Sequence, residues 1–299
     1  MHETHQFYAE DMSSVLASTT QLEGIDQLVE IVSNRRVAVL TGAGVSTDSG
    51  IPDYRGKGSS ARTPMNISDF LHSDLSRQRY WAGAHVGWQK FASAEPNAGH
   101  IALAAMEQAG IIEGVISQNV DGLHRRAGNA HVVDLHGTLN RVICIECGQQ
   151  YDRSSIEYQL TQTNPWLDEI ANIVLAPDGD VAVSDYDRLV LPHCTVCDGH
   201  LKPDVVFFGE FVPPKVFATA SHLVKRADAL LIAGSSLAVN SGIRLLEQAK
   251  RKRIPIAIIN RGNTKGDKVA ALKIEAGTSE VLAELSLRLG ATDVYEDIE

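Results

Sequence analysis

The chain has 299 residues, of which 44% are hydrophobic and 21% are charged. This composition can bury a full core in one large domain with a smaller one beside it. The formal net charge of −10 excludes a broad basic surface that neutralises a phosphate backbone, so we expect no nucleic-acid partner, whereas basic proteins or peptides are favoured electrostatically. No apolar run approaches the roughly 20 residues that span a bilayer, so we expect no membrane partner either.

The first 20 residues hold three acids and no Lys or Arg. This composition matches neither a signal peptide nor an Arg-rich, acid-poor transit peptide. We therefore predict a flexible N-terminal tail over residues 1–20 and a cytoplasmic location.

Helical and strand patterns alternate after this tail. Apolar residues recur at helical spacing between residues 22 and 32, which predicts a helix that ends near Asn34, and further helices are expected over residues 96–109, 241–250 and 279–289. Short apolar runs that end in small or polar residues predict buried strands of a parallel sheet. These runs are RVAVLTGAG, GVISQNVD, HVVDLHG, DVVFFGE, ALLIAGSS, PIAIINRG and LKIEAG.

This alternation predicts an α/β fold with a doubly wound, parallel, Rossmann-like sheet built from residues 21–140 and 203–299. Two stretches interrupt the pattern. Residues 141–202 carry all four cysteines and lack sustained alternation, so we predict a smaller inserted module there. Residues 56–95, which include Trp81 and Trp88, are expected to form a helical cap over the ligand site.

A glycine-rich turn follows the first predicted strand. Gly42 and Gly44 lie on either side of Ala43, and such a turn suits a pyrophosphate because glycines let the backbone approach closely and leave N–H groups for phosphate oxygens. Thr47 stands where the dinucleotide-binding motif has its third glycine, and no strand with a terminal acid follows about 20 residues later. A purely structural turn therefore stays open as an alternative.

The four cysteines form two CxxC pairs, Cys144 with Cys147 and Cys194 with Cys197. Nothing in the sequence indicates secretion, so metal ligation is favoured over disulfides. Paired thiolates make a tetrahedral site that suits Zn²⁺, and four of them leave no open position for a catalytic water. We predict one structural zinc per chain, with residues 141–202 as the zinc-binding module.

Polar residues follow two further predicted strands. Gln118, Asn119 and Asp121 come after one strand, and Asp134 and His136 come at the end of the next. At one edge of a sheet, such side chains supply hydrogen-bonding groups and a base that titrates near neutrality. From the residues alone, a structural role for His136 is equally open.

Taken in this order, GAGVSTDSGIPDYRG, QNVDGLH, LHG, the CxxC pairs, KPDVVFFGE and GSSL resemble the motifs of the sirtuins, from about residue 25 to residue 285. The closest resemblance is to class II, which contains the mitochondrial sirtuin associated with lipoamidase, ADP-ribosyltransferase and branched-acyl deacylase activities. Tyr54, where many sirtuins have Phe, and the segments ARTPMNISDF, RQRYW and LAPDGDV carry this closer resemblance. A bacterial-type member is expected.

The resemblance implies an NAD-dependent enzyme that removes acyl groups from protein lysines, with His136 and Asn119 as catalytic residues. Thr278 occupies a position where relatives often have Cys. The residues implied in NAD binding are Gly42, Ala43, Gly44, Ser46, Ile51, Pro52, Asp53, Tyr54, Arg55, Gln118, Asn119, Asp121, Gly234, Ser235, Ser236, Asn260, Arg261, Gly262 and Thr278. Those implied in substrate binding are Val205, Val206, Phe207, Phe208, Gly209, Leu237 and Val239.

The resemblance also implies the reaction. The acyl-lysine oxygen attacks the NAD ribose, neutral His136 takes a proton from a ribose hydroxyl, and the products are nicotinamide, O-acyl-ADP-ribose and free lysine. Because Gly83 follows Tyr80 at the position where succinyl-preferring sirtuins have Arg, we expect weak desuccinylation. The choice among acetyl, longer aliphatic, lipoyl and branched acyl groups stays open.

The alternative functions are mono-ADP-ribosylation or lipoamidase activity at the same site, and a non-enzymatic zinc-containing binding protein. We expect a monomer.

Overall fold

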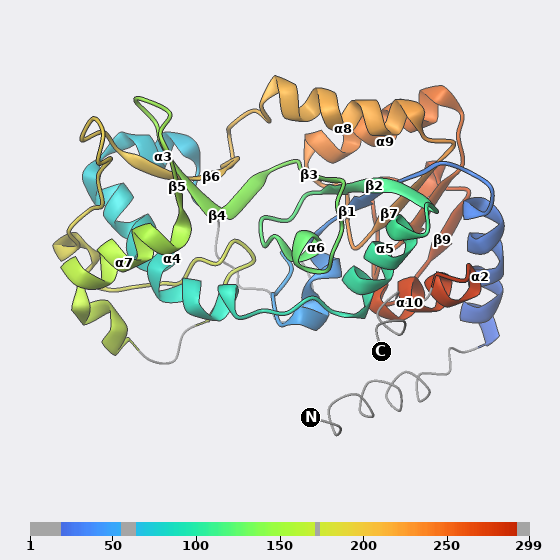
Figure 1. The fold of residues 1–299 in the computed structure, drawn as a ribbon, viewed down its shortest axis with the longest axis horizontal. Coiled ribbons are helices and arrows are strands. Elements are labelled where there is room, and N and C mark those ends of the chain that lie inside the picture. The colour runs from blue at the N-terminus through green and yellow to red at the C-terminus, as the bar shows by residue number, and fades with distance from the viewer. Residues whose placement is uncertain (1–18, 55–63, 171–173, 292–299) are drawn as a thin grey trace, which may run out of the picture.

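The computed structural model describes residues 19–54, 64–170 and 174–291. They form a large α/β part and a smaller part with its own sheet, which lie next to each other along the long axis of the molecule (Figure 1). Arg55 and nearly all of the predicted N-terminal tail lie outside the described residues.

Six parallel strands form the large sheet in the order β3-β2-β1-β7-β8-β9, which confirms the predicted fold class. Their bounds are β1 Val37–Thr41, β2 Ile112–Ser117, β3 Val132–Asp134, β7 Ala229–Ala233, β8 Ile256–Ile259 and β9 Leu272–Ile274. The central neighbours β1 and β7 are far apart in the sequence, and Thr41 is aligned with Ala233 at their carboxyl ends. The strand order reverses there, and open parallel sheets bind their ligands at such a point.

Helices cover both faces of this sheet (Figure 1). The first face is covered by α2 (Thr19–Val32), α5 (Ala98–Gln108) and α10 (Thr278–Arg288), and the other by α8 (Pro214–Arg226) and α9 (Asn240–Lys252). Strands β1 and β7 are buried along their whole length, which explains why their sequences are continuous apolar runs. The predicted helices that correspond to α5, α9 and α10 are confirmed within two residues at each end.

The smaller part is built on an antiparallel sheet in the order β5-β4-β6. Its strands are β4 Gly137–Cys144, β5 Gln150–Asp152 and β6 Leu201–Val205, so the sheet extends a few residues beyond the predicted range 141–202. The helices around it are α3 (Ile67–His72), α4 (Asp74–Ala92) and α7 (Arg153–Thr163). Apolar side chains of all three helices share one core with β4 and β6, so the helices expected over residues 56–95 pack against the small sheet.

One strand predicted for the large sheet is wrong. The run DVVFFGE, residues 204–210, begins with the last two residues of β6, which pairs with β4 in the small sheet. The rest of the run forms a turn, in which the Glu210 N–H donates to the Phe207 carbonyl at 3.0 Å. Phe207 is buried against Phe70 and Tyr80. An apolar run indicates that a segment is buried, but the periodicity does not indicate which sheet it joins.

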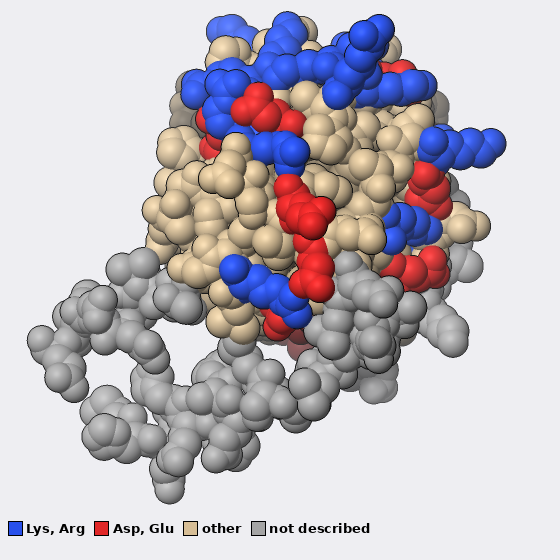
Figure 2. All heavy atoms as spheres, turned by 90° about the vertical axis from the view of Figure 1, so that its right-hand side faces the viewer, with Lys and Arg blue, Asp and Glu red and all other residues tan. Residues whose placement is uncertain are grey.

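Charge is unevenly distributed over the surface. Figure 2 shows Lys and Arg gathered along the upper edge of the molecule, the edge at which Figure 1 places α8 and α9. The last turn of α8 holds Lys225 and Arg226, and that of α9 holds Lys250, Arg251 and Lys252. Cations at helix C-termini are stabilised by the helix dipole. No helix in the described ranges is long and apolar enough to cross a bilayer.

Candidate active site

A cleft of about 2270 Å³ opens at the carboxyl ends of β1 and β7 and reaches the smaller part. It brings together almost all the site residues predicted from the sequence. Those that line it are Gly42, Ala43, Gly44, Ser46, Ile51, Pro52, Asp53, Tyr54, Gln118, Asn119, Asp121, His136, Val205, Val206, Phe207, Phe208, Gly209, Gly234, Ser235, Ser236, Val239, Asn260, Arg261, Gly262 and Thr278. Two do not join them: Arg55 lies outside the described residues, and the Leu237 side chain is fully buried in the core beside α9.

Three glycines form the closest contact between the loops that follow β1 and β7. The Gly44 N–H donates to the Gly234 carbonyl at 2.9 Å. A Cβ on Gly44 would lie 2.8 Å from Gly234 Cα, and one on Gly42 would lie 2.8 Å from the Gly234 carbonyl oxygen. Gly234 also has a φ of 63°, in the left-handed region that favours glycine. Only glycine fits at these positions, so the two loops lie backbone against backbone at the lining of the cleft, where open parallel sheets bind phosphate-containing ligands.

The chain after Gly42 differs from the common dinucleotide-binding loop. Two short 3₁₀ turns, Ala43–Val45 and Thr47–Ser49, take the place of a long helix. Thr47, which stands where the third glycine was missing, begins the second turn, and its hydroxyl donates to the Gly44 carbonyl at 3.1 Å. The loop therefore keeps its shape through its own hydrogen bonds, without close helix packing at a third glycine.

Gln118 joins the ends of three strands. Its side-chain N–H₂ donates to the Thr41 carbonyl at 3.0 Å and to Ser235 Oγ at 2.8 Å, and its own backbone carbonyl accepts from His136 at 2.8 Å. The carboxamide thus positions the glycine loops, and the backbone positions the imidazole.

Asn119, Ser46 and Asp121 form a chain of hydrogen bonds beside the glycine loop. Asn119 Nδ2 donates to Ser46 Oγ at 3.0 Å, and Ser46 Oγ donates to Asp121 Oδ2 at 2.7 Å. The other Asp121 oxygen accepts from the Leu123 N–H at 2.9 Å. Burial raises the pKa of Asp121, and the bonds from Leu123 and Ser46 oppose that shift. These contacts hold a carboxamide and a carboxyl group at the wall of the cleft.

His136 has a defined tautomer. Its Nδ1 lies 2.8 Å from the Gln118 carbonyl oxygen, which can only accept a hydrogen bond, so Nδ1 carries the proton. In the neutral ring, Nε2 is then the basic nitrogen, and it lies 2.8 Å from Ser241 Oγ. Burial lowers the pKa of His136 below 6.5, and the bond to Gln118 opposes that shift. The ring is therefore held neutral, with its lone pair at the cleft.

Ser241 is a site residue that the sequence reasoning missed. It lies in the first turn of α9, is 7% exposed, and lines the cleft. Its hydroxyl is the described partner of His136 Nε2. The sequence does offer a signal for it: Ser241 is a hydroxyl residue at the start of a predicted helix, and that helix follows the predicted ligand loop GSSL.

The segment after β6 forms the opposite wall. The Val206 N–H donates to the His136 carbonyl at 2.8 Å, so this wall is tied to the loop that carries the base. Lys202 is 8% exposed, and its ammonium donates to Glu210 Oε2 at 3.0 Å; the Phe207 N–H donates to the same oxygen at 2.7 Å. This pair fixes the turn that presents Phe208, which is exposed at the mouth of the cleft.

The far end of the cleft is formed by the loops after β8 and β9. Asn260 Nδ2 donates to the carbonyls of Arg261 and Gly262 at 2.8 and 3.1 Å, which fixes the loop after β8. Thr278 is buried, and its hydroxyl donates to the Gly44 carbonyl at 3.2 Å. The Thr side chain thus connects the start of α10 to the glycine loop.

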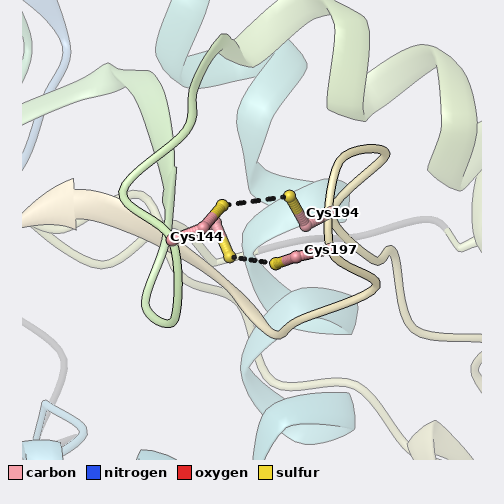
Figure 3. Close-up of side chains that lie close together, drawn as sticks. Cys144, Cys194 and Cys197 are labelled. Atoms are coloured by element: carbon pink, nitrogen blue, oxygen red, sulfur yellow. Dashed lines mark hydrogen bonds between the residues drawn. The ribbon is translucent and has the colours of Figure 1, made fainter.

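The four cysteines converge although the pairs are far apart in the sequence. Figure 3 shows Cys144 facing the loop that carries Cys194 and Cys197. All four sulfurs lie within 4.8 Å of one another, and the Cys144–Cys197 and Cys147–Cys194 sulfurs are 3.5 and 3.7 Å apart. A disulfide needs about 2.05 Å, whereas Zn–S bonds of about 2.3 Å in a tetrahedron place sulfurs about 3.8 Å apart. The donors therefore fit the predicted structural zinc.

These features define a class of protein: a parallel α/β protein with a dinucleotide-sized cleft, a neutral histidine base in it, and a four-cysteine zinc module beside it. The Sir2 family model matches residues 42–241. The chain is also 49% identical over 264 residues to NAD-dependent protein deacetylase 1 of Mycobacterium avium (strain 104), covering 87% of this chain and 94% of that one. The chain belongs to the Sir2 family.

Other relatives and solved structures agree. The human mitochondrial NAD-dependent protein lipoamidase sirtuin-4 is 45% identical over 260 residues, which cover 84% of this chain and 82% of that protein. A solved complex of Sir2 with a p53 peptide and NAD⁺ has a TM-score of 0.71 and 29% identity, over 90% of this chain and 99% of that one. A Sir2 homologue in complex with ADP-ribose has a TM-score of 0.71 and 30% identity, and the match covers 89% of this chain and 96% of that one.

Proposed function

We propose that this chain is an NAD-dependent protein-lysine deacylase. The observation that carries the proposal is the His136 ring, which is held neutral by the Gln118 carbonyl and presents Nε2 to a cleft with a glycine loop at the strand switch point. The deacetylase relatives and the Sir2 complexes with NAD⁺ and ADP-ribose support it.

The glycine loop suits the NAD pyrophosphate because Gly42, Gly44 and Gly234 let the loops after β1 and β7 pack backbone to backbone at the lining of the cleft, at the strand switch point. When bound, NAD supplies the ribose carbon from which nicotinamide leaves and the hydroxyl that accepts the acyl group. Asn119 and Asp121, which are fixed through Ser46, would hold the nicotinamide amide in place. Ser235 and the loop after β8, which line the cleft, would hold the adenosine half.

His136 acts as the general base. With Nδ1–H bonded to Gln118, only Nε2 can take a proton. The Ser241 hydroxyl is hydrogen-bonded to Nε2 until a substrate hydroxyl takes the place of Ser241. Because burial favours the neutral ring, the base is ready at neutral pH without a carboxylate partner. After the reaction the proton returns to water or to the released lysine.

The substrate polypeptide lies as an added strand between the segment after β6 and the loop after β7, with main-chain bonds that place little demand on its sequence. A solved structure of Sir2 bound to an acetylated peptide supports a peptide substrate for this chain. Phe208 and Val239 are exposed on the two sides of that path.

Lipoamidase activity is the second candidate, because human sirtuin-4 is 45% identical to this chain. It uses the same cleft and the same base, and differs only in the acyl group. Mono-ADP-ribosylation of a protein uses the same NAD site and differs in its product.

A panel of acetyl-, butyryl-, isovaleryl-, lipoyl- and succinyl-lysine peptides, incubated with and without NAD, tests the proposal by mass spectrometry. We expect nicotinamide, O-acyl-ADP-ribose and free lysine from at least one peptide, with no product without NAD. His136→Ala should abolish product while ADP-ribose still binds, and His222→Ala, which changes an exposed histidine outside the cleft lining, should turn over normally. ADP-ribose attached to protein without any deacylated peptide would instead establish the transferase.

The cytoplasmic location and the monomeric state stay predictions. Cell fractionation tests the first, and light scattering of the purified protein tests the second. The absence of nucleic-acid and membrane partners is likewise a prediction, based on net charge and hydropathy.

A further inference from the structure

Residues of α8 and α9 line part of the cleft beside the catalytic histidine, and we call this part the groove between α8 and α9. The two helices lie next to each other on one face of the sheet (Figure 1). The Ser221 hydroxyl of α8 accepts a hydrogen bond from Gln248 of α9 at 2.8 Å, which joins the helices along this groove. The residues of α8 and α9 that line it include Phe217, Ala218, Ser221, Lys225, Ser241 and Arg244.

The charge of this groove is opposite to that of the rest of the cleft. The ionisable side chains that α8 and α9 contribute to the lining are two cations, Lys225 and Arg244. The acids of the lining come from other segments, and they are Asp48, Asp53, Asp121, Asp178, Asp180 and Glu210. Within the described part of the chain, neither Lys225 nor Arg244 forms an ion pair. The groove therefore presents unneutralised positive charge in a protein whose net charge is −10.

Arg244 is held in a conformation suited to a carboxylate. Its guanidinium carbon lies 3.8 Å from the centroid of the Phe217 ring, so the planar group is stacked on an aromatic face. Stacking occupies the face of the guanidinium and leaves its N–H edges available. A guanidinium that is already ordered loses less rotamer entropy when it forms the paired hydrogen bonds that match a carboxylate.

The groove is within reach of a peptide bound at the base. Arg244 follows Ser241 by three residues on α9, so it lies about one helical turn beyond the partner of His136. Phe217, Ser221 and Lys225 are four residues apart on α8 and therefore share one face over about 12 Å. An extended polypeptide rises about 3.3 Å per residue, so this length corresponds to roughly four residues of substrate.

We propose that the groove between α8 and α9 is a specificity subsite for an acidic side chain of the substrate, within about four residues of the acyl-lysine, and that Arg244 binds its carboxylate. The proposal rests on the proposed deacylase function and adds a substrate class to it. A carboxylate on a polypeptide is favoured over a nucleic acid because the positive charge is local, whereas the net charge of the chain is negative. General attraction of basic proteins to this acidic chain and local selection of an acid next to the acyl-lysine are then separate effects.

A peptide panel with one acyl-lysine tests the subsite. Each peptide is otherwise neutral and carries Glu, Gln or Lys at one position before or after the acyl-lysine. For the wild type we expect kcat/KM to be about fivefold higher for Glu than for Gln at one or two positions on one side, and lower for Lys, as for an exposed ion pair. In Arg244→Glu the order should reverse to favour Lys at the same positions.

Arg251→Glu is the matched control, because it makes the same charge change on α9 at an exposed residue outside the cleft lining. It should keep the wild-type order. Equal kcat/KM for Glu, Gln and Lys at every position, or an unchanged order in Arg244→Glu, overturns the subsite.

If no peptide is turned over, the deacylase function fails, and the subsite is still tested by fluorescence polarisation of the same labelled peptides. Equal Kd values for the Glu, Gln and Lys peptides then overturn it. Binding of a labelled oligonucleotide that Arg244→Glu abolishes also overturns it, in favour of a nucleic-acid site.

Discussion

Two backbone contacts decide what His136 can do. The Gln118 carbonyl fixes the proton on Nδ1, and the Val206 N–H holds the His136 carbonyl, so the ring cannot turn its basic nitrogen away from the cleft without loss of a hydrogen bond. The neighbouring Asn119, Ser46 and Asp121 form their own chain of hydrogen bonds. The base and the groups that face the leaving amide are therefore held by separate hydrogen bonds, which start from the neighbouring residues Gln118 and Asn119.

The pH dependence of activity follows from the burial of His136. Because burial lowers its pKa below 6.5, the neutral base persists below pH 6.5 and is lost only as the pH falls through the lowered value. We expect the acid limb of kcat/KM to have its midpoint below 6.5, with an approximately tenfold fall per pH unit beyond it. Steady-state rates between pH 5 and 8, with folding followed by circular dichroism, measure this. A midpoint at or above 6.5 contradicts the assignment of the base or of its environment.

At the scale of elements, glycines determine how closely loops and helices approach. Gly234 meets the Gly42–Gly44 loop backbone to backbone. On α4, a Cβ on Gly83 would lie 2.0 Å from Asp180 Oδ1, and one on Gly87 would lie 2.0 Å from the Gly179 carbonyl oxygen. The loop around residues 176–181 can thus rest on α4 and place Asp180 at the wall of the cleft.

Replacement of Gly234 tests the glycine loop. Gly234→Ala adds a methyl group 2.4 Å from the Val45 nitrogen, which should separate the two loops and raise the Kd for ADP-ribose by roughly tenfold or more, about 1.4 kcal/mol. Gly110→Ala is the control, since Gly110 also has a positive φ, of 70°, but its Cβ would meet nothing within 4 Å. It should cost only about 1–2 kcal/mol of stability from backbone strain and leave ADP-ribose affinity unchanged. Calorimetric titration and thermal unfolding distinguish the two effects.

The packing at Gly83 gives a structural reason for the expected weak desuccinylation. The space that an Arg would need at this position is occupied by Asp180 and the Val181 carbonyl. We therefore expect kcat/KM for succinyl peptides to be at least about tenfold below that of the best neutral acyl peptide, because α4 contributes Tyr80 but no cation to the lining of the cleft. Gly83→Arg should displace the loop and lower all deacylation without creating a succinyl preference. A succinyl-selective Gly83→Arg enzyme would show that the loop is not the obstacle.

At the scale of the whole molecule, the zinc module and the NAD-binding sheet share one site. His136 directly precedes β4, and the substrate wall directly follows β6, so the pairing of these two strands positions both. Cys144 lies at the end of β4, close to where β6 begins with Leu201. A zinc that takes no part in the chemistry can thus be essential for it.

Removal of zinc should affect the small antiparallel sheet and leave the NAD-binding parallel sheet intact. Metal analysis of the purified protein should give about one zinc per chain, and a strong chelator or Cys144→Ser should remove it. We expect deacylation to be lost, while the parallel sheet stays folded and ADP-ribose binds within about threefold of its original affinity. Hydrogen exchange should increase first in β4, β5 and β6. Full activity in a zinc-free protein would contradict this dependence.

Local patterns in the sequence determined the parallel sheet, the helices α5, α9 and α10, the glycine loop and the identity of the four cysteines, because burial and turn geometry impose residue types at nearby positions. Only the tertiary structure decided that DVVFFGE completes a strand of the small sheet and then turns, that Leu237 is buried in the core, that Ser241 contacts the base, and that Arg244 stacks on Phe217. These outcomes depend on which segments, distant along the chain, pack together. The period of a single segment carries no information about its partner.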